Sequence, residues 1–225
     1  MEQRVRVVRG LVAAAAISIV LYVARVIFYG DFTFGYMIWN LVLAVIPFFI
    51  GVALIDRLQG RLWSEPANLA LTLLWLGFLP NSFYVATDLI HIAEVTSRTI
   101  VFDAIMLLSF TIAGLLYGYG SVVMVHRELR KRHRKNRADL VVAIIFLACS
   151  YAIYLGRYMR WNTWDVIINP IGLISNILDS LVIPRDGAPM LETTALFFVF
   201  LGSFYLVALW LWPEVLHIKK TRHRN

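Results

Sequence analysis

Charged residues and cysteines are both scarce in this sequence. Only 16% of the 225 residues are charged, 60% are hydrophobic, and the mean hydropathy is +0.73. Soluble domains carry about a quarter of their residues as charges, so this composition excludes a soluble globular protein and indicates a polytopic membrane protein. The single cysteine, Cys149, lies within an apolar run and has no partner for an internal disulfide. The fold must therefore be held by packing alone.

A secretory cleavage site is also lacking after the first apolar run, residues 10–28. That run is long enough to cross a bilayer, so we expect it to be retained as a transmembrane helix. Five further runs of similar length follow it. The sequence predicts an all-α fold, a single integral membrane domain over residues 1–225 that forms a helical bundle. Its six transmembrane helices are expected near residues 10–28, 36–55, 67–87, 101–125, 138–158 and 191–212.

The net charge of +7 comes from short basic runs beside the apolar spans. Such runs set orientation and meet anionic lipid headgroups, so we expect membrane lipids rather than nucleic acid as partners. Alternate segments outside the spans, with Arg157 at the end of the fifth span counted in the segment that follows it, carry 16 and 4 Lys and Arg residues. By the positive-inside rule both termini are predicted to be cytoplasmic. The densest run, residues 127–137, is interpreted first as a topology determinant and second as a headgroup-binding patch.

Residues 166–183 have two interpretations. After Pro170, apolar residues recur at helical spacing with polar residues between them, which is an amphipathic pattern. If this segment crossed the membrane, the basic tail would lie outside, against the charge distribution. We therefore expect it to lie on the outer surface or to form a shallow re-entrant helix.

The outer ends of three predicted spans collect most of the polar side chains. Counting 1.5 Å per residue places Asp103 and Arg157 at matching depth, where a carboxylate and a guanidinium have reason to pair. Arg25 is expected to snorkel outward from the first span, and Asn40 to form a bond between helices. Asn81, beside Pro80, has a local role as its simplest interpretation. The outer cluster consists of Asn81, Tyr84, Asp88, His91, Asp103, Arg157, Arg160, Trp161, Asn162, Trp164 and Asp165.

Three motifs in this cluster resemble a known family. They are Leu-Pro-Asn at 79–81, Thr-Asp-Leu-Ile-His at 87–91 and Gly-Arg-Tyr-Met-Arg-Trp-Asn-Thr-Trp-Asp at 156–165. Together with Phe102-Asp103 and Gly114, they resemble the bacterial membrane-protein family catalogued as domain of unknown function 1361, over roughly residues 35–212. The resemblance implies a multi-pass protein of the bacterial cytoplasmic membrane, and it brings no activity with it.

The chemistry of the cluster leaves several hypotheses open. Asp88, His91 and Asp103 are candidate catalytic groups. Asp88 and His91, with Asp103, Asp165 or Glu94, are also candidates for a divalent metal site. Histidine pairs that would hold haem within the spans are missing, so haem is not expected. Arg157 and Arg160 suit a phosphate or carboxylate, and the neighbouring aromatic residues suit a lipid chain. The other interpretation is that Asp103–Arg157 and Arg160–Asp165 are internal ion pairs.

Three classes of function follow from these interpretations. The first is a binding or structural membrane protein with an outer polar pocket for an anionic lipid or glycolipid headgroup. The second is an enzyme that modifies a lipid or glycolipid with Asp88, His91 or Asp103. The third is a small-solute transporter, which is disfavoured because the polar residues gather at one end of the spans and no repeat is evident.

Overall fold

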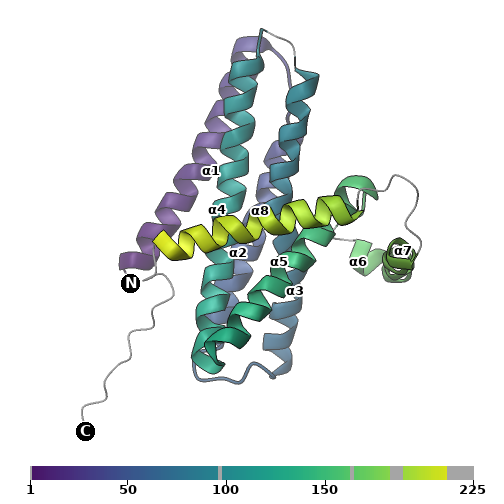
Figure 1. Cartoon of the computed structure of the whole chain (residues 1–225). Helices are drawn as coiled ribbons and strands as arrows, with labels where there is room; N and C mark the ends of the chain where they lie inside the picture. The colour runs from purple at the N-terminus through teal and green to yellow at the C-terminus, as the bar shows by residue number, and fades with distance from the viewer. Residues whose placement is uncertain (1, 96–97, 163–164, 183–189, 212–225) are drawn as a thin grey trace. The chain divides into compact units, whose positions relative to one another are not determined.

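The computed structural model describes residues 2–95, 98–162, 165–182 and 190–211, and these residues form helices with no strand among them (Figure 1). The prediction of an all-α fold with six membrane-spanning helices is confirmed, because six helices are long and apolar enough to cross a membrane. They are α1 (Glu2–Tyr29), α2 (Tyr36–Arg57), α3 (Pro66–Tyr84), α4 (Ile100–Arg132), α5 (Lys135–Tyr158) and α8 (Met190–Leu211). The chain divides into two compact units, residues 1–121 and 122–225.

The first unit is a bundle of α1, α2, α3 and most of α4. Its core contains Phe34, Met37, Leu41 and Phe110, which are at most 3% exposed. Large apolar side chains also lie on the outside, such as Leu73, which is 69% exposed. Helices that are apolar on all sides are expected where lipid, rather than water, surrounds the bundle.

Two glycines one turn apart on α4 allow close packing against α3. A Cβ at Gly114 would lie 2.8 Å from the backbone oxygen of Ser82, and one at Gly118 would lie 2.7 Å from the ring of Phe83. The spacing is that of the small-xxx-small motif, which lets membrane helices approach closely. The same contact region is held by the Ser82 hydroxyl, which donates a 2.6 Å hydrogen bond to the carbonyl of Ala44 on α2.

Gly114→Ala should therefore reduce the stability of the fold. The added methyl would clash with a backbone oxygen, which cannot move aside by a change of side-chain rotamer. Overpacking of this kind costs about 1–3 kcal/mol. Thermal unfolding of the detergent-solubilised protein measures the effect. Gly77→Ala on α3 is the matched control, because a Cβ there has no atom within 4 Å and should leave stability equal or slightly higher. Equal stability of the two variants would contradict the packing described here.

The third span ends differently from the α-helix expected to residue 87. After Tyr84 the chain continues as a ten-residue 3₁₀ helix, η1 (Val85–Glu94). The hydroxyl of Thr87 donates to the carbonyl of Tyr84, three residues back, which suits the tighter winding. Because 3₁₀ helices have three residues per turn, side chains at i and i+3 lie directly in line. Asp88 and His91 are therefore brought onto one face of η1.

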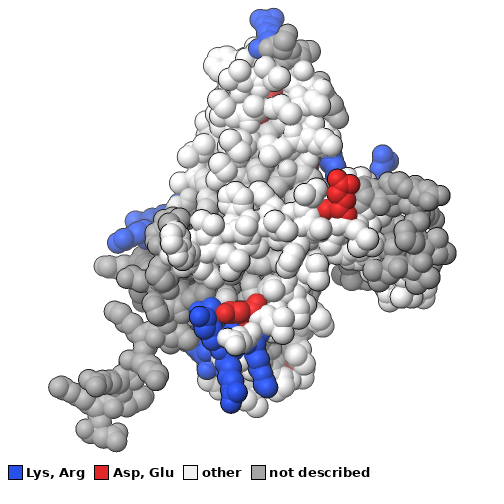
Figure 2. All heavy atoms as spheres, in the orientation of Figure 1, with Lys and Arg blue, Asp and Glu red and all other residues white. Residues whose placement is uncertain are grey.

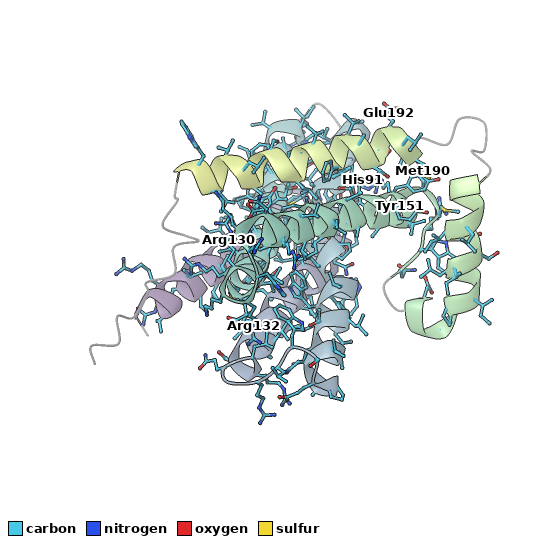
Figure 3. The ribbon with its side chains drawn as sticks, turned by 60° about the horizontal axis from the view of Figure 1, so that its bottom comes forward. His91, Arg130, Arg132, Tyr151, Met190 and Glu192 are labelled. Atoms are coloured by element: carbon cyan, nitrogen blue, oxygen red, sulfur yellow. The ribbon has the colours of Figure 1, made fainter. Side chains whose placement is uncertain are left out.

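The second unit contains the end of α4, α5, the short α6 (Asp165–Ile168), α7 (Pro170–Val182) and α8. Helix α8 packs along α5 and runs in the opposite direction (Figures 1 and 3). Its Tyr205 ring contacts Phe146 of α5 at 5.1 Å between centroids. Helix α7 begins at an N-cap asparagine followed by proline, and Oδ1 of Asn169 accepts the N–H of Gly172 at 3.1 Å.

Candidate functional site

The end of α5 carries an arginine in an unusual backbone conformation. Arg160 has φ 58°, the left-handed region that favours glycine, and it is the one non-glycine residue with positive φ in the described part of the chain. Helix α5 ends here, and the N–H groups of Met159 and Trp161 both donate to the carbonyl of Leu155 in its last turn. Arg160 is exposed, and Arg157, one turn earlier, is half-buried. We call residues 157–162 together with Asp165 the α5–α6 turn.

Asp165 does not pair with Arg160, which was one of the two sequence interpretations. Its Oδ2 accepts hydrogen bonds from the backbone N–H of Asn162 at 2.7 Å and from Nδ2 of Asn162 at 3.3 Å. These bonds tie the entry of α6 to the end of α5. Within the described residues, the Arg160 side chain has no ion pair or hydrogen bond. Trp164, another predicted site residue, lies outside the described residues.

An amphipathic helix follows the α5–α6 turn, as the pattern predicted. On α7, Ile171, Ile174 and Leu178 are 82%, 56% and 56% exposed and share one helical face. An apolar face of this kind, on a helix too short to span, is typical of a helix that lies in the membrane interface. Trp161, half-buried at the end of α5, is of the residue type that prefers the same level.

In the first unit, Asp103 is held by a residue that the sequence analysis placed elsewhere. Arg25 of α1 was expected to snorkel outward, and this is wrong, because its side chain is 5% exposed and turns into the bundle. Its Nε donates to Oδ1 of Asp103 at 2.5 Å, and its guanidinium lies 4.6 Å from the ring centroid of Phe34. Asp103 itself is fully buried. An internal partner and an aromatic face outweigh the benefit of reaching water.

Asp31, in the loop between α1 and α2, completes this cluster from the surface. Its Oδ2 accepts from Nη2 of Arg25 at 3.1 Å, and its backbone carbonyl accepts from Nη1 at 3.0 Å. The hydroxyl and the N–H of Thr33 donate to the same carboxylate. The hydrogen bond from the Thr33 hydroxyl, assisted by the nearby Arg25, holds the pKa of Asp31 below its ordinary value.

The predicted contact between Asp103 and Arg157 would join the two units. Asp103 lies in the first unit and Arg157 in the second, and each is described within its own unit. The contact therefore stays a prediction.

Asp88 and His91 face α2 in register with two of its residues. Oδ2 of Asp88, a residue 2% exposed, accepts from Nδ2 of Asn40 at 2.8 Å. The His91 ring meets Tyr36 edge-on, with 5.6 Å between centroids. The bond expected of Asn40 between helices is thus present, and its partner is the buried carboxylate. Asp88 and His91 are one 3₁₀ turn apart on η1, and Asn40 and Tyr36 are about one α-helical turn apart on α2, so the two pairs of side chains lie opposite each other.

The other predicted residues of the third span have local contacts. Nδ2 of Asn81 donates to the carbonyl of Phe78 at 3.0 Å, within the same helix, which agrees with a local role beside Pro80. Tyr84 is half-buried at the end of α3. For metal binding, no three His, Cys, Asp or Glu side chains come together in the described part of the chain. The Glu94 side chain lies outside the described ones.

A polar network in the second unit was missed by the sequence analysis. His126 of α4 is 1% exposed, with Nε2 2.9 Å from Oδ1 of Asp139 on α5 and Nδ1 2.8 Å from Oη of Tyr205 on α8. Arg130 donates to the same Asp139 oxygen through Nη2 at 2.6 Å. Nε of Arg130 lies 3.1 Å from both Nε2 of His126 and Oδ1 of Asp139. In the tautomer with its hydrogen on Nε2, the ring donates to the carboxylate and Nδ1 accepts from the tyrosine hydroxyl. We call these four residues the His126 network.

One signal in the sequence pointed to this network. His126 and Arg130 are four residues apart, so they share a helical face, and Asp139 is an acidic residue just after a strongly basic run. The partner on α8 is 79 positions from His126 and could not be inferred from spacing.

The fold and these sites define an all-helical, multi-pass membrane protein. A family model described as "Protein of unknown function (DUF1361)" matches residues 39–209, and the chain belongs to this family. No curated protein and no solved structure gives a significant match. The family match spans the α5–α6 turn, η1 and Asp103, whereas Arg25 precedes it.

Proposed function

We propose that the α5–α6 turn binds the anionic headgroup of a membrane lipid or glycolipid. The observation that carries this proposal is Arg160, which is exposed, bears a permanent positive charge and occupies a left-handed conformation. A non-glycine residue in that region costs on the order of 1 kcal/mol, and such strain tends to occur where function needs a particular side chain. A glycine would adopt this backbone conformation without strain. The side chain is therefore the reason for an arginine at this position.

The surroundings of Arg160 suit a lipid more than a soluble anion. Arg157, on the last turn of α5, brings a second guanidinium to the same helix end, and two such groups bind a phosphate through fixed donor geometry. Trp161 and the apolar face of α7 supply surface for an acyl or prenyl chain. Asn162 and Asp165 hold the turn in shape through their own hydrogen bonds.

Lipids that co-purify with the protein test this proposal. We expect native mass spectrometry to show anionic lipid on the wild type and much less of it on the double variant Arg157→Gln/Arg160→Gln. The control is Arg98→Gln, which removes an exposed cation from the first unit. Identical lipid profiles for the wild type and the double variant, with both proteins folded, would exclude the proposal.

An enzyme that modifies such a lipid is a second candidate, supported by the alignment of Asp88 and His91 on η1. Asp88 is buried and hydrogen-bonded, while His91 is half-buried, so His91 is the better placed of the two to exchange a proton with a ligand. Asp103 is bonded to Arg25 and fully buried, an arrangement that favours a structural role. If the protein is catalytic, cells expressing the wild type should contain a lipid with an altered headgroup that is missing with His91→Gln. An unchanged lipid composition in both would remove this candidate.

For the orientation, we propose that both termini are cytoplasmic and that the membrane is the bacterial cytoplasmic membrane. The charge distribution supports this, since the α4–α5 turn is strongly basic and the loop between α1 and α2 has no Lys or Arg. In a Cys149→Ala background, Phe32→Cys should react with an impermeant thiol reagent added to intact cells. His133→Cys should react after the cells are opened and not before. The reverse pattern would overturn the orientation.

A further inference from the structure

The turn between α4 and α5 concentrates positive charge in the second unit. Residues 127–137 include seven Lys and Arg residues and a single acidic residue, Glu128. Figure 2 shows Lys and Arg side chains gathered beside acidic ones in the lower part of the view, and Figure 3 labels Arg130 and Arg132 at this end of α4. The structure shows which of these cations are neutralised within the fold.

Acidic side chains engage three of the seven. Glu128 accepts from Nζ of Lys131 at 2.9 Å and from Nε of Arg132 at 2.8 Å, and its side chain is 9% exposed. Asp139 accepts from Nη2 of Arg130 at 2.6 Å. These cations are committed to pairs that help to hold the ends of α4 and α5.

Arg134, Lys135 and Arg137 are different. All three are exposed, and among the residues that the structure describes their side chains make no ion pair or hydrogen bond. Helix α4 ends at Arg132 and α5 begins at Lys135, so the connection is two residues long. Both helices are candidate membrane spans. A connection this short keeps the three cations close to the ends of both candidate spans.

We propose that Arg134, Lys135 and Arg137 form a second binding site for anionic phospholipid, separate from the α5–α6 turn. The 24 residues of α5 separate the two sites by about 36 Å, roughly the thickness of a bilayer, so the two sites serve opposite leaflets. A lipid is favoured over nucleic acid or an acidic protein because the cations lie so close to the apolar spans. Lys131 and Arg132 are not part of this site, because both are paired with Glu128.

Lipid titration in the background Arg157→Gln/Arg160→Gln tests this site alone, so its failure is distinct from failure of the proposed function. The probe is phosphatidylglycerol, with phosphatidylcholine as the neutral lipid, and native mass spectrometry counts the bound lipids. Arg134→Gln/Lys135→Gln should weaken phosphatidylglycerol binding about tenfold or more, because each cation near a lipid surface contributes substantially to attraction. The charge-matched control is Arg6→Gln/Arg9→Gln on α1, which should change binding less than twofold.

A variant with the opposite expected effect completes the test. Glu128→Gln frees two cations and should strengthen phosphatidylglycerol binding several-fold, whereas Glu192→Gln, an exposed acidic residue at the start of α8, should not. Arg134 and Lys135 are exposed, so their double variant should fold like its parent. Equal loss of binding in the α1 control would show a general charge effect and overturn the proposal. The proposal would also be overturned if binding of an oligonucleotide required Arg134 and Lys135 while binding of phosphatidylglycerol did not.

Discussion

Asp103→Ala should lower the free energy of unfolding by about 3–5 kcal/mol, because it leaves Arg25 charged and buried without its main partner. The Arg25–Asp103 pair joins α1 to the start of α4, and both side chains are almost completely shielded from solvent. We expect less folded protein by size-exclusion chromatography and a lower thermal midpoint in detergent. Loss of folded protein before any loss of function distinguishes a structural pair from a catalytic carboxylate.

Two further variants make the test specific. Asp31→Ala removes the exposed carboxylate that binds the same arginine and should cost much less stability than Asp103→Ala, because exposed ion pairs contribute little. Arg25→Leu/Asp103→Leu removes both buried charges and should recover much of the lost stability. If Asp103→Ala is as stable as Asp31→Ala, the buried pair is not what holds α1 to α4.

His126→Ala should be the second most damaging change, with an expected loss of about 2–4 kcal/mol. It removes a buried side chain together with one hydrogen bond of the Tyr205 hydroxyl and one of Asp139. Since these partners lie on α8 and α5, we expect the docking of α8 to weaken first. Limited proteolysis at the start of α8, compared with thermal unfolding, measures this.

His133→Ala is the matched control for the His126 network. His133 is an exposed histidine seven positions further on, and its removal should change stability by less than about 0.5 kcal/mol. Tyr205→Phe, which removes only the hydroxyl that is hydrogen-bonded to His126, should give an intermediate loss of about 1–2 kcal/mol. Stability of His126→Ala equal to that of His133→Ala would show that the network contributes little.

The sequence was sufficient to predict the spans because bilayer thickness sets the length of each apolar run, and such a run is recognised from consecutive residues alone. Residues 36–55, for example, were predicted as a span that the structure gives as Tyr36–Arg57. The amphipathic pattern of α7 was likewise readable from its spacing. The winding of η1 was not, because it depends on hydrogen bonds such as that from Thr87 to Tyr84 and on contacts with α2. Tertiary context decides between such similar helices.

The candidate site could be predicted only in part, for a related reason. Charge at a span end indicated a partner for Asp103 and an outward position for Arg25, but the choice between water and an internal partner depends on what lies opposite. Asp103 and Phe34 supply that environment for Arg25, and they are 78 and 9 positions away in the chain. The positive φ of Arg160 could not be predicted from the sequence, because glycine is the residue expected in that conformation.

Arg160→Gly tests most directly whether this arginine is kept for its charge. Glycine accepts φ 58° without strain, so the variant should be as stable as the wild type or slightly more stable by thermal unfolding. Its retained anionic lipid, measured by native mass spectrometry, should nevertheless fall sharply. Arg160→Lys, which keeps the charge but loses the forked donor geometry, should retain an intermediate amount. Wild-type levels of bound anionic lipid on a stable Arg160→Gly protein would contradict the proposal that the α5–α6 turn is a headgroup site.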